Sequence, residues 1–421
     1  MSTRYRVSVR RDEFIEWIKN LLMTPFVLHA HLQPAAEIRL KEARQYQRSL
    51  AIADARRRYA EIWFDIEALI QDHRRHMEHG DTQPSKLKVL VPSIGEFFTD
   101  LPLRDAFLIV DQKRFISSRR FVAPSFNDIR HVLSVAQLLA HARSNDLKLI
   151  TFDGDLTLYE HGQGIEPDSE ILPLLLDLLK RDIRVVILTA AGYPDKSGQR
   201  YKERFHGLLD GIRDSQELTD AQRQSFAVLG GECNYLFKYC EAGLQHVADE
   251  EWMLDEMKVW RDEDITKLLN LAESVLRECI DIMSLPAQII RKQRSVGLVP
   301  TAGRLTRETL EEVVLAVQRT LQSQNKANIP FCAFNDCDVW VDIGDKALGA
   351  RCLQKYFGGI LPRQTLHCGD QYNSSGNDIR TRTVATGMWV GGVDDTVNWL
   401  GMFREMSKHD GAYFSHRGTY R

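Results

Sequence analysis

The sequence predicts an α/β fold, in which a mainly helical N-terminal region precedes a largely parallel sheet with a long inserted segment. From Leu147 onward, short apolar runs ending in acidic or glycine residues alternate with helical patterns, which is typical of buried parallel strands. Before that point, the apolar residues follow helical spacing. Because 421 residues exceed what one hydrophobic core usually organises, we expect two or three domains.

The composition is that of an ordinary globular protein, with 43% hydrophobic and 27% charged residues. A formal net charge of −3 gives no bias towards nucleic acid or membranes, so we expect neither as a partner. No apolar stretch approaches the roughly 20 residues needed to cross a bilayer. The basic segment Arg4–Arg11 is expected to be a solvated face.

The cysteines are odd in number and include no CxxC pair, which fits neither a disulfide framework nor a zinc site. We therefore expect reduced, mostly buried thiols in a cytoplasmic protein. They are Cys233, Cys240, Cys279, Cys332, Cys337, Cys352 and Cys368.

Residues 1–145 are expected to form a mainly helical region that serves oligomerisation or regulation. One helix is predicted from Asp12, and a longer one over 35–76. A third begins after Ser125, where Asp128 three positions later approximates a capping box. Between them, the segment KLKVLVPSIGEFFTDLP reads as a strand-like run followed by turn residues.

The catalytic core is expected at 146–200 plus 330–421. The run LKLITFDGD, a helix over Glu170–Lys180 and the run IRVVILTA form a βαβ unit. Residues 201–329 contain both helix and strand patterns and are expected to form a cap domain. The strand–turn–helix pattern then resumes with VWVDIG, a helix from Lys346 and the strand TLHCGD.

Asp153 and Asp155 follow the first of these strands, in the motif DGDLT. Two carboxylates two residues apart on a loop can face one small site. Asp153 suits the role of nucleophile and metal ligand in phosphoryl transfer. Asp155 can protonate the leaving group and then activate water. An acidic turn after a strand is the plain structural alternative.

Thr189 and Lys346 stand at the ends of the next two apolar strands. The Thr189 hydroxyl and adjacent backbone N–H groups can hold a phosphate oxygen, although a polar residue closing a strand is the common reading. Lys346 can neutralise the phosphate as a point charge. Lys196 and Lys292 compete with it for this role.

Asp370 and Asp378 follow the last of these strands, in GDQYNSSGND. Carboxylate oxygens suit Mg²⁺, which retains several waters and needs few protein ligands. The expected magnesium ligands are therefore Asp153, Asp155, Asp370 and Asp378, with Asp378 binding either directly or through water.

These four motifs, in this order, resemble those of the haloacid dehalogenase superfamily. The acidic second position of the DxD motif is similar to that of its phosphatases and phosphomutases. The resemblance implies a haloacid dehalogenase-type Rossmann-like core, with a large α+β cap inserted between the second and third motifs. That arrangement favours Lys346 over the competing lysines.

Longer segments resemble the IMP-specific 5′-nucleotidase family over nearly the whole chain. They include LVPSIGEFFTDLPL, ISSRRFVAPSFNDIRHVL, TFDGDLTLYEHG, GGECNYLFKY and DVWVDIGDKALG. The resemblance implies Mg²⁺-dependent hydrolysis of inosine 5′-monophosphate (IMP), in purine nucleotide salvage or catabolism. It also implies a homotetramer that responds to ATP or another purine nucleotide. QYNSSGND and Asn335–Asp338 are shorter than the family pattern, which bears on fine substrate preference.

Substrate recognition is expected around the phosphate site. Tyr193 and Arg204 match the family's AGY and YxxR pattern, and Arg204 can meet the phosphate or the base. Strand alternation sends Trp340 and Asp342 to one side, as a base-stacking face and a ribose ligand. Alternatively, Trp340 lies in the core and Asp342 caps the helix at Lys346.

Asn127, Arg130 and His131 are expected to form an effector-nucleotide pocket between subunits, because SFNDIRH resembles the family's sequence. His131 as a packing residue is the alternative. Two other functions stay open at this point: a sugar-phosphate phosphatase or phosphomutase of the same superfamily, and a non-catalytic nucleotide sensor. Retention of both Asp153 and Asp155 speaks against the sensor, which has no use for an acid–base carboxylate.

Overall fold

The computed structural model describes residues 12–30 and 41–408. The basic segment Arg4–Arg11 and the start of the helix expected over 35–76 lie outside these residues. The described chain divides into two compact units that meet between Asn145 and Asp146. Each unit is described separately below.

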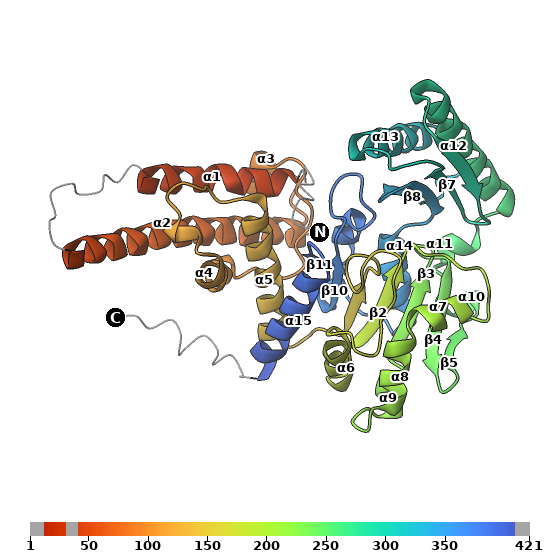
Figure 1. Ribbon diagram of the computed structural model, residues 1–421, viewed down its shortest axis with the longest axis horizontal. Coiled ribbons are helices and arrows are strands. Elements are labelled where there is room, and N and C mark those ends of the chain that lie inside the picture. Colours follow the sequence, from red (N-terminus) through yellow and green to blue (C-terminus); the bar gives the residue numbers. More distant parts are fainter. Residues whose placement is uncertain (1–11, 31–40, 409–421) are drawn as a thin grey trace. The chain divides into compact units, whose positions relative to one another are not determined.

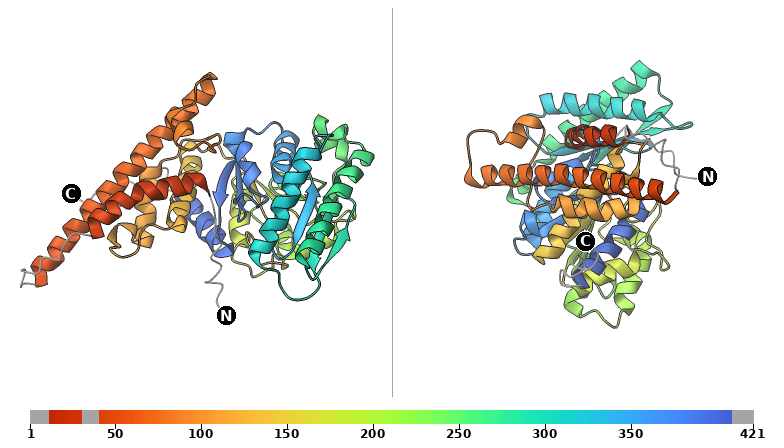
Figure 2. Two further views of the ribbon diagram at one scale, coloured as in Figure 1. Left: turned by 90° about the horizontal axis from the view of Figure 1, so that it is seen from above. Right: turned by 90° about the vertical axis from the view of Figure 1, so that its left-hand side faces the viewer.

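The N-terminal unit is helical, as predicted. Helix α1 packs along the long helix α2, and α2 also contacts α3 and α4 (Figures 1 and 2). Its core includes the buried side chains of Tyr59, Trp63 and Phe107. The helices are α1 (Glu13–Ala30), α2 (Lys41–His79), α3 (Lys86–Leu90), α4 (Leu103–Arg114), the short η2 (Ile116–Ser118) and α5 (Phe126–Ser144).

The segment predicted as a strand-like run begins instead with helix α3. Ser85 caps this helix by accepting a hydrogen bond from the Lys88 backbone N–H. Only Leu87 is buried within the helix, and Val89 and Leu90 are exposed. The apolar run was misleading because the cap residue, and not the number of apolar side chains, decides the local conformation.

Within the described residues, no helix is both long and apolar enough to cross a membrane.

The second unit contains a seven-stranded sheet in the order β11-β10-β1-β2-β3-β4-β5 (Figure 1). The first five strands in this order are parallel, and β4 and β5 extend the edge as antiparallel strands. The strands are β1 (Leu149–Phe152), β2 (Arg184–Thr189), β3 (Phe226–Gly230), β4 (Tyr235–Cys240), β5 (Gly243–His246), β10 (Thr365–Gly369) and β11 (Thr386–Trp389).

Helices surround this sheet. Helix α6 contacts β2, α8 and α15, and helix α14 contacts β2 and α10. The α-helices are α6 (Leu172–Lys180), α7 (Gln199–Arg204), α8 (His206–Asp214), α9 (Asp220–Arg223), α10 (Asp249–Trp252), α11 (Asp255–Lys258), α14 (Lys346–Tyr356) and α15 (Val393–Lys408). The short helices are η3 (Pro362–Gln364) and η4 (Ile379–Thr383).

The strand order reverses between β1 and β10. From β1 the chain continues to β2 and β3 on one side, whereas β10 continues to β11 on the other. The carboxyl ends of strands at such a switch point form the usual crevice for a ligand in an open α/β sheet. Asp153 and Asp370 directly follow β1 and β10, so the topology places both at this point.

The inserted cap is a four-stranded antiparallel sheet in the order β6-β7-β9-β8, covered by two helices. Side chains from both helices and from the sheet share one hydrophobic core. Figure 2 shows the two helices side by side over the strands. The elements are α12 (Asp262–Met283), β6 (Ala287–Arg291), β7 (Ser295–Pro300), α13 (Arg307–Gln324), β8 (Phe331–Asn335) and β9 (Val339–Ile343).

These two sheets correct the cap boundaries expected at 201 and 329. Strands β3, β4 and β5 lie within 201–329 but pair with β2 in the larger sheet. Strands β8 and β9 lie beyond 329 but pair with β7 in the cap. The strand VWVDIG therefore belongs to the cap, because its apolar residues Val339, Val341 and Ile343 face the cap helices.

Candidate active site

Asp153 is held at the carboxyl end of β1 by the neighbouring strand. Its backbone N–H donates to the carbonyl of Cys368 on β10 at 2.8 Å, and its Oδ1 accepts from the Gly154 N–H at 2.8 Å. Gly154 is needed there, since a Cβ at this position would overlap the Tyr159 hydroxyl. The side chain of Asp153 is buried, and burial raises the pKa of its carboxyl to about 7 despite the opposing charge of Lys346.

Lys346 joins the first and last motifs of the site. Its Nζ lies 2.7 Å from Oδ1 of Asp153 and 2.8 Å from Oδ1 of Asp378, and the side chain is 0% exposed. Burial opposes the charge of Lys346, but the two carboxylates outweigh it and raise its pKa well above the usual value. The prediction that Lys346 reaches the site is therefore confirmed in position.

Asp378 is the most heavily bonded carboxylate of the site. Besides Lys346, it contacts Nε2 of His367 at 2.8 Å and accepts from the Gln371 N–H at 2.8 Å. Burial alone would raise its pKa, but Lys346 and His367 together hold it below the ordinary value. His367 is itself fixed by Thr151, whose hydroxyl lies 2.8 Å from Nδ1. Asp378 is thus held as a carboxylate in one orientation.

Three of the four expected metal ligands gather in one place. Oxygen atoms of Asp153, Asp370 and Asp378 lie within 4.8 Å of one another. A set of carboxylate oxygens fits Mg²⁺ or another hard cation better than a soft metal. The side chain of Asp155 is not part of this group.

Asp155 is bound by Arg204 instead. Nη2 of Arg204 donates to both carboxylate oxygens of Asp155, at 2.7 and 2.9 Å. Nε of Arg204 also donates to the Gln163 carbonyl, and its guanidinium lies 4.8 Å from the centre of the Tyr159 ring. Arg204 therefore binds Asp155 in this structure, and the expected contact of Arg204 with the phosphate or base stays a prediction, as does the expected metal contact of Asp155.

Thr189 ends β2 beside the nucleophile loop. It is buried, and its Oγ1 accepts from the Ala191 N–H at 3.1 Å. A Cβ built on Gly154 would lie 3.3 Å from this oxygen, so the two motifs are in contact. The predicted meeting of these strand ends is confirmed.

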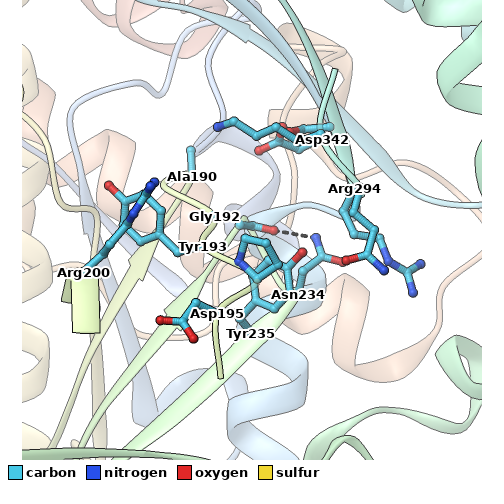
Figure 3. A pocket seen from close by; sticks show the side chains of 14 residues that line it. Ala190, Gly192, Tyr193, Asp195, Arg200, Asn234, Tyr235, Arg294 and Asp342 are labelled. Atoms are coloured by element: carbon cyan, nitrogen blue, oxygen red, sulfur yellow. Dashed lines mark hydrogen bonds between the residues drawn. The ribbon is translucent and has the colours of Figure 1, made fainter. Parts of the chain in front are cut away.

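A cleft of about 430 Å³ opens beyond Thr189, between loops of the larger sheet and the turn that joins β6 to β7. Figure 3 shows Tyr193 and Arg200 on one side and Arg294 on the other, with Asp342 at the upper end. Tyr193 and Asp342 were predicted to recognise substrate. The other lining residues are Ala190, Gly192, Pro194, Asp195, Gly231, Asn234, Tyr235, Lys292, Gln293 and Ser295.

Asp342 and Trp340 share one face of β9, as alternation predicts, but only Asp342 lines the cleft. Burial raises the pKa of Asp342 to about 7. Trp340 packs on Gly297, where a Cβ would lie 2.7 Å from its ring, and Nζ of Lys292 lies 4.2 Å from the ring centre. Its Nε1 donates to Asp338 at 2.9 Å. The residue that caps the helix at Lys346 is Asp345, not Asp342.

Comparison with known proteins decides the family. The family model described as IMP-specific 5′-nucleotidase matches residues 1–400. The chain belongs to the IMP-specific 5′-nucleotidase family. This membership confirms the predicted family and makes the protein an enzyme, a hydrolase of phosphoric monoesters.

Relatives with this name match over almost their full length. The "IMP-specific 5′-nucleotidase 1" of Emericella nidulans is 46% identical, covering 95% of this chain and 98% of the relative. That of Yarrowia lipolytica is 47% identical, covering 97% and 99%. A solved structure of an IMP-bound mutant of Plasmodium falciparum IMP-nucleotidase has a TM-score of 0.81 at 31% identity, covering 96% and 100%. The predicted haloacid dehalogenase-type fold is confirmed.

The residues that this 5′-nucleotidase was expected to use for an effector lie at the start of α5. Nε of Arg130 donates to Asn127 at 3.2 Å, and its Nη2 lies 3.3 Å from Nε2 of His131. Arg130 is buried within the N-terminal unit. The three predicted side chains therefore touch one another, and their binding of an effector stays a prediction.

Sequence reasoning missed Glu232, His367 and Arg200. Glu232 is fully buried beside the catalytic motifs, and Arg200 lies over the Tyr193 ring at 5.2 Å. The run FAVLGGE ends in glycine and an acid, the same signal that identified Asp153, so Glu232 was detectable. His367 stands as one polar residue inside a buried strand, which was a weaker signal.

Proposed function

We propose that the protein hydrolyses IMP to inosine and phosphate, with Mg²⁺, through an aspartyl-phosphate on Asp153. The observation that carries the proposal is Lys346, which touches both Asp153 and Asp378 in a fully buried position. Such a cation between two carboxylates suits a site that must receive and neutralise a phosphate. The names of the relatives support IMP as the substrate.

The proposed first step is attack by Asp153 on phosphorus. Lys346 and the Gly154 N–H hold Oδ1, which orients the carboxylate. A bond forms between Asp153 and phosphorus while the bond to the ribose 5′ oxygen breaks, and Asp155 gives that oxygen its proton. Asp155 must turn away from Arg204 to do this, because Arg204 binds both of its oxygens here.

In the second step, Asp155 removes a proton from water, which attacks the phosphorus of the acyl phosphate. The bond from phosphorus to Asp153 breaks, and phosphate leaves. Asp153, Asp370 and Asp378 would hold the magnesium ion, which supplies charge neutralisation of the phosphate oxygens. Thr189 and its neighbouring backbone N–H groups are proposed to bind a phosphate oxygen.

The cleft beside Thr189 is the proposed nucleoside site. Tyr193 and Tyr235 offer aromatic faces for the base, and Asp342 offers a buried carboxyl to the ribose. Trp340 is proposed to support this site from behind, by holding Lys292 over its ring.

We also propose a homotetramer whose activity responds to ATP or another purine nucleotide through Asn127, Arg130 and His131. A solved structure of the Plasmodium falciparum IMP-nucleotidase is ATP-bound, which supports a nucleotide effector. The described cysteines are all free thiols, which supports a cytoplasmic location. The names of the relatives support the proposed place in purine nucleotide salvage or catabolism.

The test of the nucleophile is Asp153→Asn. We expect phosphate release from IMP to fall by about four orders of magnitude, because an amide cannot form the acyl phosphate. The matched control is Asp168→Asn, an exposed aspartate that should leave turnover unchanged. Substantial activity in Asp153→Asn would refute the nucleophile assignment.

Substrate choice is tested separately with IMP, GMP, AMP and hexose phosphates on the wild-type enzyme. We expect kcat/KM to be highest for IMP. Comparable values for hexose phosphates would show a broader phosphatase and overturn the nucleotide assignment, while leaving the role of Asp153 intact.

A further inference from the structure

Glu232 carries a buried carboxyl that is only half satisfied. Its side chain is 0% exposed, and its Oε1 accepts from Nδ2 of Asn377 at 2.9 Å. Among the described residues, its Oε2 is buried and has no hydrogen-bond partner. A buried polar atom without a protein partner is costly, so we expect a water molecule or a ligand group to satisfy it.

The turn around Glu232 is built to place this side chain. Glu232 adopts φ +64°, a left-handed conformation that is uncommon for residues other than glycine. Its N–H donates to the Thr189 carbonyl at 3.0 Å, which ties the turn to the end of β2. Nδ2 of Asn234 donates to the carbonyls of Gly231 and Ile343, which ties the same turn to β9. The conformation is thus fixed from both the core and the cap.

The charged neighbours of Glu232 show where its carboxyl lies. Burial raises its pKa well above the usual value, Lys346 opposes that rise, and Asp342 and Asp153 add to it. Lys346 and Asp153 mark the phosphate end of the site, whereas Asp342 lines the nucleoside cleft. Geometry places Glu232 at the junction of the two: its carboxyl binds Asn377, which precedes Asp378, and its backbone follows Gly231 of the cleft wall.

We propose that Glu232 is a substrate-binding residue whose free carboxyl oxygen binds a hydroxyl of the ribose. This inference rests on the proposed function. The ribose is the part of a nucleoside monophosphate that lies between phosphate and base, as Glu232 lies between the two ends of the site. A ribose hydroxyl can donate to Oε2 or accept from it, so it suits the carboxyl in either protonation state, whereas a phosphate oxygen can only accept. Glu232 thereby separates nucleotides from simple phosphate esters.

The experiment compares Glu232→Gly and Glu232→Ala with wild type on two substrates. Glycine suits φ +64°, so Glu232→Gly removes the carboxyl without new backbone strain. We expect kcat/KM for IMP to fall by at least about tenfold, mainly through KM, because a buried hydrogen bond to the ribose is lost. Hydrolysis of p-nitrophenyl phosphate, which has no ribose, should change by less than about twofold. Glu241→Ala is the control, an exposed glutamate between β4 and β5.

A second arm uses IMP analogues that lack the 2′- or the 3′-hydroxyl. One of them should have a lower kcat/KM than IMP with the wild-type enzyme. This difference should vanish in Glu232→Gly, because the variant and the analogue each remove one partner of the same hydrogen bond. Equal losses on IMP and p-nitrophenyl phosphate would show that Glu232 only supports the catalytic loop. Full wild-type activity on both analogues would also overturn the proposal, whether or not the variants fold. A wild-type enzyme without preference for IMP would instead refute the proposed function.

Discussion

Lys346 is a cation taken completely out of water. Burial of an unpaired ammonium is costly, and the two carboxylates at 2.7 and 2.8 Å offset that cost. Removing the carboxylate of Asp153 or of Asp378 would leave the buried charge of Lys346 with only one anionic partner. The pair of contacts therefore positions Asp153 and Asp378 relative to each other before any substrate binds.

The titration of Asp342 should make the free energy of unfolding depend on pH. Burial raises its folded pKa from 3.8 to about 7, so its contribution to stability is present below about pH 4 and is lost as the pH rises to about 7. The full effect corresponds to at most roughly 4 kcal/mol. We expect Asp342→Asn to gain stability over wild type as the pH increases across this range.

The measurement is thermal unfolding of metal-free protein between pH 4 and 8. Asp262→Asn is the control, since that side chain is 93% exposed and should show no pH-dependent difference. A constant difference in melting temperature between Asp342→Asn and wild type would contradict the prediction.

At the residue scale, the residues located at strand ends could be predicted from the sequence. Contacts made by long side chains could not. Asp153, Asp370 and Lys346 each follow a strand and Thr189 ends one, and the topology brings them together. The contact between Arg204 and Asp155 was not predicted, because a long flexible side chain can meet any partner within several ångströms and spacing along the chain does not identify which one.

At the element scale, helix α5 is the best example of local rules. The predicted capping box is present: Ser125 accepts from the Asp128 N–H, and Asp128 accepts from the Ser125 N–H. Arg114 and Arg119 also bind Asp128, and although burial opposes its charge, these contacts lower its pKa to about 2. The cap thus connects α5 to the segment that precedes it.

Asp128→Asn should destabilise the N-terminal unit by about 2 kcal/mol, because the buried carboxylate that two partly exposed arginines bind is lost. The folded pKa is depressed, so the contribution exists above about pH 4 and is lost as the pH falls towards 2. Urea unfolding of Asp128→Asn and wild type at pH 7 and pH 3 measures both the loss of stability and its dependence on pH. Asp105→Asn is the matched control, because its ion pair with Arg143 is exposed and should contribute less than about 1 kcal/mol. Equal losses in the two variants would be inconsistent with this account.

Elements whose identity depends on tertiary pairing were harder to predict. The apolar run of β9 was recognised as a strand, but its partner was not, since an apolar strand fits either sheet. The pairing of β9 with β7 and β8 places it in the cap. For the same reason β3–β5 were assigned to the insertion, although the core sheet continues through them.

At the scale of the whole molecule, metal binding should stabilise the protein. Asp153, Asp370 and Asp378 lie together, and Mg²⁺ would relieve their mutual repulsion. We expect a chelator to abolish turnover, and saturating Mg²⁺ to raise the melting temperature, with about 2.7 kcal/mol gained at a hundredfold excess over Kd. Asp370→Asn should lose most of this gain. Identical melting curves with and without Mg²⁺ in wild type would refute the magnesium site.

The connection from β9 to α14 has a consequence for exchanging caps between relatives. Only Gly344 and Asp345 separate the last residue of the cap strand from Lys346. Gly344 adopts φ +84°, and a Cβ there would overlap Sγ of Cys233, so this link tolerates neither insertion nor a larger residue. A chimera with a foreign cap must therefore keep the register of β9 relative to Lys346. Changes in base preference are then more accessible through loop substitutions in 190–200 and 292–295 than through replacement of the whole insertion.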